Sequence, residues 1–541
     1  MVAATEWDSW MNKTSAKERA VVDRLERLAA TLPGLTFRRD DLELYRTDIY
    51  YVADQPPAAI VAPRTTEDVV ALVNSARSLG LTLAVRGGGL SYSAGYLACD
   101  DRTVMLDMSG MNAIVTLSPE DRYVTVEAGV TWLQLHEALQ PLGLTTPFWG
   151  TFSGRHATIG GTVSQGGKFY GSASRGSSAE SVLALEVVTG AGEVIVTGSA
   201  AALDAASPFF RNYGPDLAGL FLGDCGAFGI KTRITLQLVP APRSLGHCTF
   251  SFDDASRQLA AMGEIGAELL ASECLGMDPF TARSRMASEG LTRDIGTLVS
   301  IVRAGGLGLG GWRDAASIAW AGRRFANEVG YLMNCVTEGR DGADAQSKLR
   351  RVQAIARKHG GRALPASIPK VMRALPFPPM NGLLTPSAKR MNWLHTVVPN
   401  SRGGECFEAT EAVFAQHGQA MRQHGIDRGY LFSTHGPNGV GVETLIRWSD
   451  EPYPLHLAWL SEPERTKLKP RKANPEAAEA VRALSADIVK AWTVLGGVHL
   501  QIGRKYPFLE TRQPATATLL RDLKKRFDPD GVLSPGSVVP L

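Results

Sequence analysis

The chain has 541 residues, of which 44% are hydrophobic and 21% charged, and its formal net charge at neutral pH is +3. This length exceeds what one compact core usually holds, so two or more domains are expected. The small net charge, without a polybasic run, disfavours nucleic acid as a partner, and no apolar run approaches the ~20 residues that span a bilayer.

The six cysteines are scattered and none forms a CxxC pair. The sequence therefore predicts neither a disulfide framework nor a zinc site, and no bound metal is expected. The N-terminus lacks the apolar core of a secretory signal. A reducing compartment fits this cysteine usage, so a cytoplasmic protein is expected.

Residues 1–54 are expected to form an N-terminal helical segment, because apolar residues recur at helical spacing over 14–32 before a Pro-Gly pair ends the pattern. Residues 58–86 predict a strand, a helix and a second strand. Thr65 and Asp68 have the spacing of a capping box at the start of that helix, and a glycine stands where the helix should end.

A glycine cluster follows the second of these strands, from Arg86 to Ser93. A nicotinamide-binding unit would show GxGxxG leading directly into a helix, but here the glycines lead into a polar loop. A nicotinamide cofactor is therefore disfavoured. Backbone amides in such a cluster can still cradle a diphosphate.

The stretch from Pro147 to Val188 is the densest in glycine, with small hydroxyl residues between the glycines. Glycine allows a ligand to approach the backbone closely, and freed amides can bind anions. The stretch suits a large, flat, phosphate-bearing cofactor. Composition alone leaves an irregular surface loop as the alternative.

Prolines at 240 and 242 mark a boundary, which predicts a first large domain over 55–243. Residues 244–500 predict a second, α+β domain with one antiparallel sheet and helices on one face. Its strands are expected around 247–252, 298–303, 330–336, 392–398, 429–435 and 442–448, and its helices around 253–271, 405–424 and 475–495. Residues 304–313 predict a glycine-rich loop, and 360–390 an irregular, proline-rich segment.

The C-terminal segment, 501–541, predicts a helix followed by a strong turn at Asp528-Pro529-Asp530-Gly531. We expect this segment to return to the first domain.

The order of these pieces resembles the vanillyl-alcohol oxidase / p-cresol methylhydroxylase (PCMH) superfamily of FAD-dependent oxidoreductases. The resemblance rests on PRTTEDVVALVNSARSLGLTLAVRGGGLS, ATIGGTVSQGG, GLFLGDCGAFGIKTRITLQLVP and FDPDGVLSPG, in that order along the chain. It implies an α+β fold in which a two-part PCMH-type FAD-binding domain carries an α+β substrate domain, or cap, with an antiparallel sheet.

The resemblance also implies which residues hold FAD. They come from the cluster after the second strand, from the central stretch, and from a glycine-isoleucine pair for the adenine end. These residues are Arg86, Gly87, Gly88, Gly89, Leu90, Ser91, Tyr92, His156, Thr158, Ile159, Gly160, Gly161, Thr162, Ser164, Gly166, Gly167, Gly229 and Ile230.

One departure bears on how the flavin is held. Relatives with covalent flavin in this loop carry histidine where Leu90 stands, and leucine offers no nucleophile. Noncovalent FAD is therefore the expectation. His156 is expected to make a polar contact or to be a satisfied structural histidine rather than a linkage, and attachment through His395 in the cap stays open.

Catalytic groups are expected from the cap and the C-terminal segment. Arg504 or its neighbour Lys505 would place positive charge near the flavin, and His499 would act as a base or hydroxyl partner. Tyr506 with Arg504 could hold a phenolate, and His395 is the fourth candidate. These four catalytic candidates are Arg504, His499, Tyr506 and His395.

Two further groups could also face the substrate, namely His435 and the pair Glu443 and Arg447. This pair lies on one strand face, where an exposed charge pair is slightly favoured over a substrate contact.

The 2-hydroxy-acid branch of the superfamily uses two motifs with metal-ligand histidines and a glutamate. Here valine replaces one histidine at Val442 and the glutamate at Val498, which disfavours that metal site. The preferred expectation is an FAD oxidoreductase that takes hydride from a small, aromatic alcohol or an activated benzylic C–H. A D-2-hydroxy-acid dehydrogenase and a sugar or lactone oxidase remain alternatives. Oxygen or an electron-acceptor protein would reoxidise the flavin, and a homo-oligomer is left open.

Overall fold

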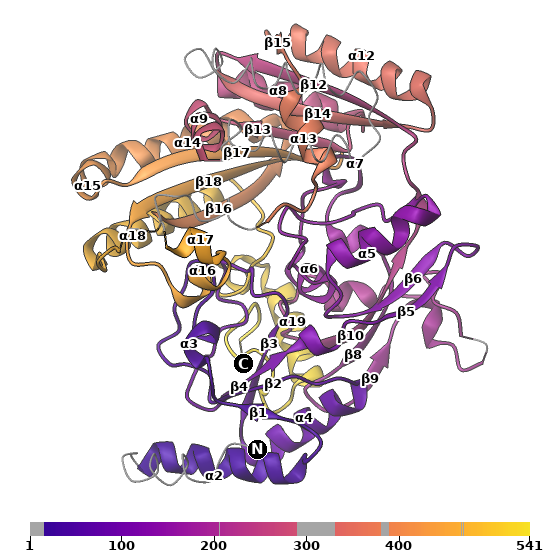
Figure 1. Cartoon of the computed structure of the whole chain (residues 1–541), viewed down its shortest axis with the longest axis vertical. Coiled ribbons are helices and arrows are strands. Elements are labelled where there is room, and N and C mark those ends of the chain that lie inside the picture. The colour runs from indigo at the N-terminus through magenta and orange to yellow at the C-terminus, as the bar shows by residue number, and fades with distance from the viewer. Residues whose placement is uncertain are drawn as a thin grey trace.

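The structure, a computed structural model, describes residues 16–204, 206–288, 330–379, 389–466, 468 and 470–540. Two sheets of the N-terminal half occupy the lower part of Figure 1, and one large sheet lies above them. The fold is mixed α and β with an antiparallel cap sheet, which confirms the predicted fold class. In the described part of the chain, no helix is long and apolar enough to cross a membrane.

The first sheet has the strand order β1-β2-β4-β3, and β2, β4 and β3 run parallel. Its strands are β1 (Phe37–Arg38), β2 (Ala59–Val61), β3 (Thr82–Arg86) and β4 (Thr103–Asp107). Helix α4 (Thr66–Leu79) connects β2 to β3. The predicted capping box is confirmed, because the Asp68 amide donates to Thr65 Oγ1 at 3.1 Å and Thr65 N–H donates to Asp68 Oδ2 at 3.1 Å. The predicted stop is Gly80, at φ +62°.

The second sheet is antiparallel, with the order β5-β6-β10-β8-β9. Its strands are β5 (Ile114–Ser118), β6 (Tyr123–Glu127), β8 (Val182–Val188), β9 (Val194–Val196) and β10 (Ile230–Gln237). Helices α5 (Trp132–Leu139), α6 (Ile159–Gln165) and α7 (Ser172–Arg175) lie between β6 and β8 in the sequence. This half of the chain shares one hydrophobic core with the C-terminal helix.

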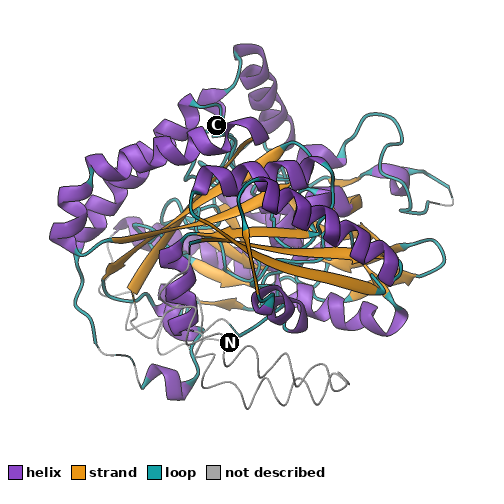
Figure 2. Cartoon of the chain, turned by 90° about the horizontal axis from the view of Figure 1, so that it is seen from above, coloured by secondary structure: helices purple, strands orange, loops and turns teal. Residues whose placement is uncertain are grey.

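The cap sheet has seven strands in the order β15-β12-β14-β13-β17-β18-β16. They are β12 (Ser244–Phe252), β13 (Glu273–Met277), β14 (Tyr331–Gly339), β15 (Arg362–Leu364), β16 (Lys389–Pro399), β17 (Asp427–His435) and β18 (Gly439–Ser449). Helices α8 (Ala255–Ala267), α12 (Gly342–Lys358), α14 (Gly403–Gln416) and α18 (Pro475–Val494) pack on the sheet and share its core. Figure 2 shows helices lying along the strands.

The remaining elements are short or lie at the edges of the two sheet systems. They are α2 (Ala16–Thr31), α3 (Leu42–Tyr45), β7 (Leu144–Thr145), β11 (Val239–Pro240), α9 (Pro279–Ser288), α13 (Ser367–Ala374), α15 (Gly418–His424), α16 (Pro454–Ala458), α17 (Glu462–Arg465) and α19 (Pro514–Phe527).

Five of the predicted cap strands are confirmed as β12, β14, β16, β17 and β18, and β13 was not predicted. Its sequence, ECLGM, is short and carries a glycine, so it lacks a strand signal. The helix expected over 405–424 breaks at His417 into α14 and α15. The segment 360–390 is not irregular throughout, because it contains β15 and α13. The strand at 298–303 and the loop at 304–313 lie outside the described residues.

The C-terminal segment lies beside β3, where Leu83 N–H donates to Val532 O and Ser534 N–H to Leu83 O, each at 2.8 Å. A buried lysine fastens the turn that precedes this contact. Lys524 Nζ donates to Ala227 O at 2.7 Å and Leu533 O at 3.0 Å, and it pairs with Asp528 at 2.6 Å. The turn thereby joins the end of the chain to the loop before β10.

A strap from the cap, residues 365–379, holds the two halves together. Phe377 is 1% exposed and packs beside Trp149 and Tyr170, with ring centroids 6.0 and 5.9 Å away. A Cβ on Gly154 would lie 2.5 Å from the Phe377 ring, so the strap needs glycine there. Tyr170 OH donates to Pro376 O at 2.7 Å and fixes the strap from the other side.

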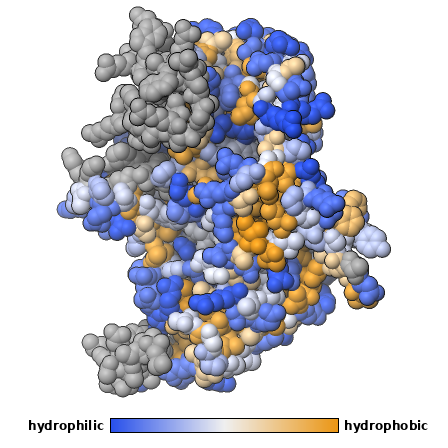
Figure 3. Space-filling view, turned by 45° about the vertical axis from the view of Figure 1, so that its right-hand side comes forward, coloured by the Kyte–Doolittle hydropathy of each residue, from blue (hydrophilic) through white to orange (hydrophobic). Residues whose placement is uncertain are grey.

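The face in Figure 3 mixes hydrophilic and hydrophobic residues. Several large apolar side chains stay exposed in the loop after β9. Phe209 is 57% exposed and Tyr213 78%. Phe209 therefore offers a matched exposed phenylalanine for a test of the strap.

We expect F377A to lower the free energy of unfolding by about 3–5 kcal/mol, because truncation leaves a cavity between the two halves. F209A should change it by less than about 0.5 kcal/mol. Urea unfolding followed by tryptophan fluorescence measures both. Equal effects of the two substitutions would contradict the role given to the strap.

Candidate functional site

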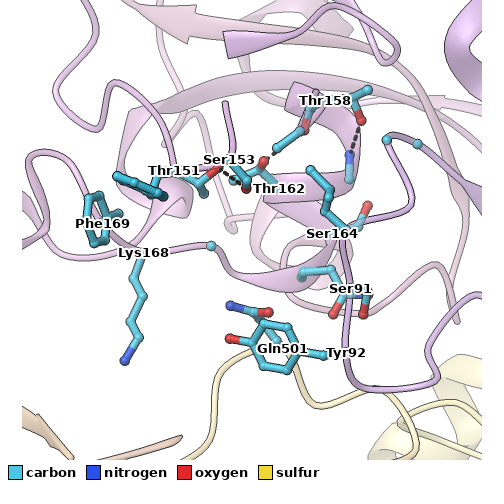
Figure 4. A pocket seen from close by; sticks show the side chains of 18 of the residues that line it. Ser91, Tyr92, Thr151, Ser153, Thr158, Thr162, Ser164, Lys168, Phe169 and Gln501 are labelled. Atoms are coloured by element: carbon cyan, nitrogen blue, oxygen red, sulfur yellow. Dashed lines mark hydrogen bonds between the residues drawn. The ribbon is translucent and has the colours of Figure 1, made fainter. Parts of the chain in front are cut away.

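One deep cleft runs between the N-terminal half and the cap sheet (Figure 4). Its floor comes from three segments rich in glycine or small hydroxyl residues, 87–92, 157–168 and 225–231. Its opposite wall comes from the cap strands β13, β16, β17 and β18 and from the strap. Two glycine-rich stretches far apart in the sequence therefore meet at one site.

The floor is built from two loops in direct contact. A Cβ on Gly87 would lie 2.2 Å from Thr158 Oγ1, and a Cβ on Gly88 would lie 2.0 Å from the carbonyl oxygen of His156. Both distances are far shorter than a carbon atom tolerates. The loop after β3 can therefore pack on the loop before α6 only because these positions lack side chains.

Helix α6 begins at the floor of the cleft, and Thr158 caps it by accepting the Gly161 N–H at 3.2 Å. Thr162 Oγ1 donates to Thr158 O at 2.8 Å and accepts the Trp132 indole N–H at 2.8 Å. A Cβ on Gly161 would meet only Thr158 Oγ1 within 4 Å, at 3.1 Å. Gly161 thus leaves open space above the floor.

A buried ion pair shapes the third segment. The carboxylate of Asp224 pairs with Lys231 and accepts the N–H groups of Gly226 at 3.1 Å and Phe228 at 3.2 Å. A Cβ on Gly229 would lie 2.3 Å from Val187 Cγ1. The loop therefore packs tightly on β8 and presents Gly226, Gly229 and Ile230 to the cleft.

Most residues that the family resemblance assigned to FAD line this cleft. They are Gly87, Gly88, Gly89, Leu90, Ser91, Tyr92, Thr158, Gly160, Gly161, Thr162, Ser164, Gly167, Gly229 and Ile230.

Four assigned residues lie behind the lining. The Arg86 guanidinium stacks 4.4 Å from the centroid of the Tyr45 ring, and Ile159 is fully buried. His156 turns its ring to Trp459, 4.6 Å away. Gly166 ends α6 at φ +64°. None of these four is among the residues that line the cleft.

The floor fits FAD. Three backbone segments without bulky side chains suit a long cofactor with a diphosphate, because such segments can offer amide donors at close approach. The space next to Gly161 lies over the same floor. Apolar side chains such as Val85, Met108 and Ile230 also line the cleft. When FAD is bound, residues 87–92 and 157–167 would hold it.

A polar cluster lies where the end of the second floor segment meets the cap, and we define it as Lys168 from the floor and Ser433, His435 and Glu443 from the cap. Lys168 Nζ lies 3.5 Å from His435 Nε2, and Ser433 Oγ lies 2.9 Å from the same nitrogen. Figure 4 shows the Lys168 side chain extending into the cleft on the side of Tyr92 and Gln501.

Burial shapes the charges of this cluster. Burial lowers the pKa of Lys168, and the carboxylate of Glu443 partly opposes that shift. Burial also lowers the pKa of His435 well below its ordinary value, and the nearby Lys168 adds to this. His435 is therefore neutral near pH 7, and a larger share of Lys168 is the free amine than in solution.

Aromatic and apolar side chains surround the cluster. The Tyr92 and Trp393 rings lie 5.4 Å apart, and both line the cleft. Other apolar lining residues are Phe152, Phe169, Leu275, Met277, Met372 and Leu431. These side chains come from both halves of the chain, and we call them the aromatic wall; apart from a few convergent polar groups this part of the cleft is apolar, as small-molecule sites usually are.

The four catalytic candidates from the sequence lie one layer behind this wall. The hydroxyl of Tyr506 accepts the His395 backbone N–H at 2.9 Å, and the rings of Tyr506 and His499 stack with centroids 4.1 Å apart. His395 Nε2 accepts the Leu500 N–H at 3.0 Å. Arg504 donates to Leu97 O at 2.9 Å. None of these four side chains lines the cleft.

Glu443 and Arg447 do not form the exposed pair that was slightly favoured. Glu443 lines the cleft, whereas Arg447 is 7% exposed and donates to Ser284 Oγ. His435 and His499 do not converge either, because His499 Nδ1 bonds His395 O at 2.8 Å. Within the described ranges, no group of three or more His, Cys, Asp or Glu side chains is arranged to hold a metal ion.

Sequence reasoning missed Lys168, Gln501 and β13 at the site. A signal for Lys168 existed, because it is the only lysine, arginine or carboxylate between Arg155 and Arg175 in the central glycine-rich stretch. Gln501 gave no signal beyond its place in the C-terminal segment. Its backbone, at φ +55°, donates to Gln165 O at 2.7 Å, which brings the side chain to the cleft.

Family models match two parts of the chain. Residues 57–198 match an FAD binding domain, and residues 470–538 match the C-terminal domain of FAD linked oxidases.

Curated relatives match the chain over less than half its length. The glycolate oxidase subunit GlcD of Escherichia coli is 31% identical over 250 residues, which cover 45% of this chain and 48% of that protein. Cytokinin dehydrogenase 3 of Arabidopsis thaliana is 29% identical over 225 residues, covering 41% of this chain and 40% of that protein. The chain thus spans about half the length of these relatives, or less.

Solved structures share the fold over nearly the whole chain. A p-cresol methylhydroxylase with substrate bound has a TM-score of 0.72 at 19% identity and covers 98% of both chains. A 4-ethylphenol oxidase from Gulosibacter chungangensis, in an isoeugenol complex, has a TM-score of 0.69 at 16% identity, covering 97% of this chain and 98% of that one.

We expect G161V to weaken FAD binding by at least about tenfold, because the added methyl groups enter the space above the floor. The melting temperature of the FAD-free protein should change little, since few atoms lie near that Cβ. G342V, at a helical glycine outside the cleft where an added Cβ meets nothing within 4 Å, is the control. Flavin fluorescence titration measures both affinities, and an unchanged affinity in G161V would contradict this placement of the cofactor.

Proposed function

Because the chain belongs to the PCMH-type superfamily of FAD-linked oxidases, we propose that it is an FAD-dependent oxidoreductase that oxidises a small aromatic alcohol. The observation that carries this proposal is the aromatic wall around the polar cluster. It is apolar and aromatic, and its polar groups converge around Lys168. Such a wall suits an apolar ring with one hydroxyl-bearing carbon better than a sugar, whose many hydroxyls need many partners.

Alcohol oxidation removes a hydride from carbon and a proton from the hydroxyl. FAD, when bound, supplies the acceptor for the hydride. We assign the proton to Lys168, since burial lowers the pKa of this side chain toward the range of a useful base. His435 Nε2, which also contacts Ser433, holds the amine in place.

The aromatic wall orients the substrate. Tyr92 and Trp393 on one side and Phe169 on the other would confine the ring, and the Gln501 amide lies beside Tyr92 (Figure 4). Tight confinement of this kind excludes water and keeps the reacting carbon over the floor.

We further propose that FAD is held noncovalently. Leu90 lines the cleft and offers no nucleophile. His395 is fully buried, its Nε2 accepts a backbone N–H at 3.0 Å, and its Nδ1 lies 3.3 Å from the hydroxyl of Tyr506. Both nitrogens of His395 are engaged within the protein, which argues against a link at that residue.

A D-2-hydroxy-acid dehydrogenase is the second candidate. Its support is the similarity to the glycolate oxidase subunit and to a mitochondrial D-lactate dehydrogenase of Arabidopsis thaliana, 32% identical over 194 residues that cover 36% of this chain and 32% of that protein. Against it stand Val442 and Val498 at two ligand positions of that branch and the separation of His435 from His499.

Anaerobic mixing with a panel of alcohols tests the substrate class. We expect benzylic alcohols to bleach the flavin absorbance near ~450 nm, because the apolar wall accepts their rings. D-2-hydroxy acids and sugars should bleach it at least about a hundredfold more slowly. Bleaching by hydroxy acids alone would contradict the aromatic assignment and favour the second candidate.

We expect K168R to lower kcat by about a hundredfold or more, because a guanidinium keeps its proton and cannot act as a base. The amount of bound FAD should stay unchanged. K358R, at an exposed lysine paired with Glu264, is the matched control. Rapid-reaction kinetics of flavin reduction measure the step, and a rate within about twofold of wild type would remove Lys168 from the base role.

A further inference from the structure

Behind the aromatic wall lies a buried lysine, Lys505, on the segment that returns to the N-terminal half. Its Nζ donates to Tyr92 O at 3.2 Å, to Asn392 Oδ1 at 2.7 Å and to Trp393 O. Three acceptors match the three hydrogens of an ammonium group. These acceptors belong to the loop after β3 and to β16, so one side chain joins both sides of the cleft.

Four tyrosine rings enclose this ammonium. Their centroids lie 5.0 Å from Nζ for Tyr92, 5.2 Å for Tyr50, 5.8 Å for Tyr51 and 5.9 Å for Tyr506. Aromatic faces stabilise a cation at such distances. The site is thus arranged for a charged lysine although it is buried.

The carboxylate of Asp48 completes the arrangement. It is fully buried and accepts the N–H groups of Tyr50 at 2.7 Å, Tyr51 at 2.5 Å and Ala94 at 2.7 Å. It thereby fixes the tyrosine pair and the loop that carries Tyr92. It also supplies negative charge that favours the protonated form of Lys505.

We infer that Lys505 is a positioning residue, whose ammonium sets the spacing of the Tyr92 and Trp393 rings against the substrate. This inference rests on the proposed function, since it takes those two rings as part of the substrate wall. Lys505 itself does not line the cleft. It acts through the backbone carbonyls of the two residues that do.

Deprotonation of Lys505 should weaken the contact between the loop after β3 and β16, because a neutral amine has only two N–H groups for three acceptors. Burial lowers the pKa of Lys505 to about 7, and Asp48 and Glu443 oppose the shift. A raised pKa for the four tyrosines and a lowered pKa for His395 and His499 keep these neighbours neutral near pH 7. Burial raises the pKa of Asp48 to about 6, so this carboxyl is ionised above that pH.

The sign of the pH effect follows from these shifts. The protonated Lys505 holds the wall, so its deprotonation should lower kcat/KM as pH rises through about 7, opposite in sign to the rise that deprotonation of the base Lys168 gives. Removing the negative charge in D48N lowers the pKa of Lys505 further and should move this fall to lower pH. In K505R the arginine stays charged at every accessible pH, so kcat/KM should no longer decrease as pH rises through about 7.

Hydrogen exchange of the FAD-loaded protein tests the inference without substrate. In K505M, amides of residues 88–95 and 391–396 should exchange about tenfold faster than in wild type, since each segment loses a hydrogen bond. K524M is the matched control, because Lys524 is also buried with three oxygen acceptors but contacts the C-terminal turn. K524M should speed exchange near that turn only.

The inference is supported if amides in both wall segments of K505M exchange faster and if the decrease of kcat/KM in D48N occurs at lower pH than in wild type. The inference is overturned if amide exchange in K505M is unchanged, or if kcat/KM of D48N decreases at the same pH as that of wild type. If K505M fails to fold, D48N and K505R decide the matter. If no aromatic alcohol is oxidised but the wall segments lose protection as expected, the substrate proposal fails and Lys505 still holds the two segments together.

Discussion

Contact between two glycine loops is the constraint on which the rest of the site depends. Gly87 and Gly88 lie so close to Thr158 and His156 that a single Cβ would meet Thr158 Oγ1 at 2.2 Å or the His156 carbonyl at 2.0 Å. The contact brings the end of β3 to the start of α6. It forms one continuous floor from segments about 70 residues apart, as only bare backbone can.

A few buried side chains join distant segments of the chain around this floor. Phe377 fills an aromatic cage in the N-terminal half, Lys524 ties the C-terminal turn to the loop before β10, and Lys505 bonds both sides of the wall. Burying a lysine is costly unless each N–H finds an acceptor. Lys505 and Lys524 each find three, so they link distant segments without leaving an unsatisfied charge.

The glycine-rich floor of the cleft was predictable from the sequence, and the polar cluster across it largely was not. Gly87 to Tyr92 and Thr158 to Gly167 follow local rules about glycine and capping, which a sequence displays directly. Local sequence does not show that Lys168, Glu443 and Gln501 lie near one another. The pairing of β17 with β18 places Glu443, and a left-handed backbone conformation in the C-terminal segment places Gln501. For His395, His499 and Tyr506, side-chain chemistry suggested catalysis, whereas packing places them outside the lining of the cleft.

The most direct test of the account is a crystal structure of the reduced, FAD-loaded protein with a benzylic alcohol bound. The account predicts the flavin ring over Gly161 and the alcohol oxygen within hydrogen-bond distance of Lys168 Nζ, with the aromatic ring against Tyr92 and Trp393. An alcohol oxygen held away from Lys168, or a flavin ring outside the cleft, would contradict it.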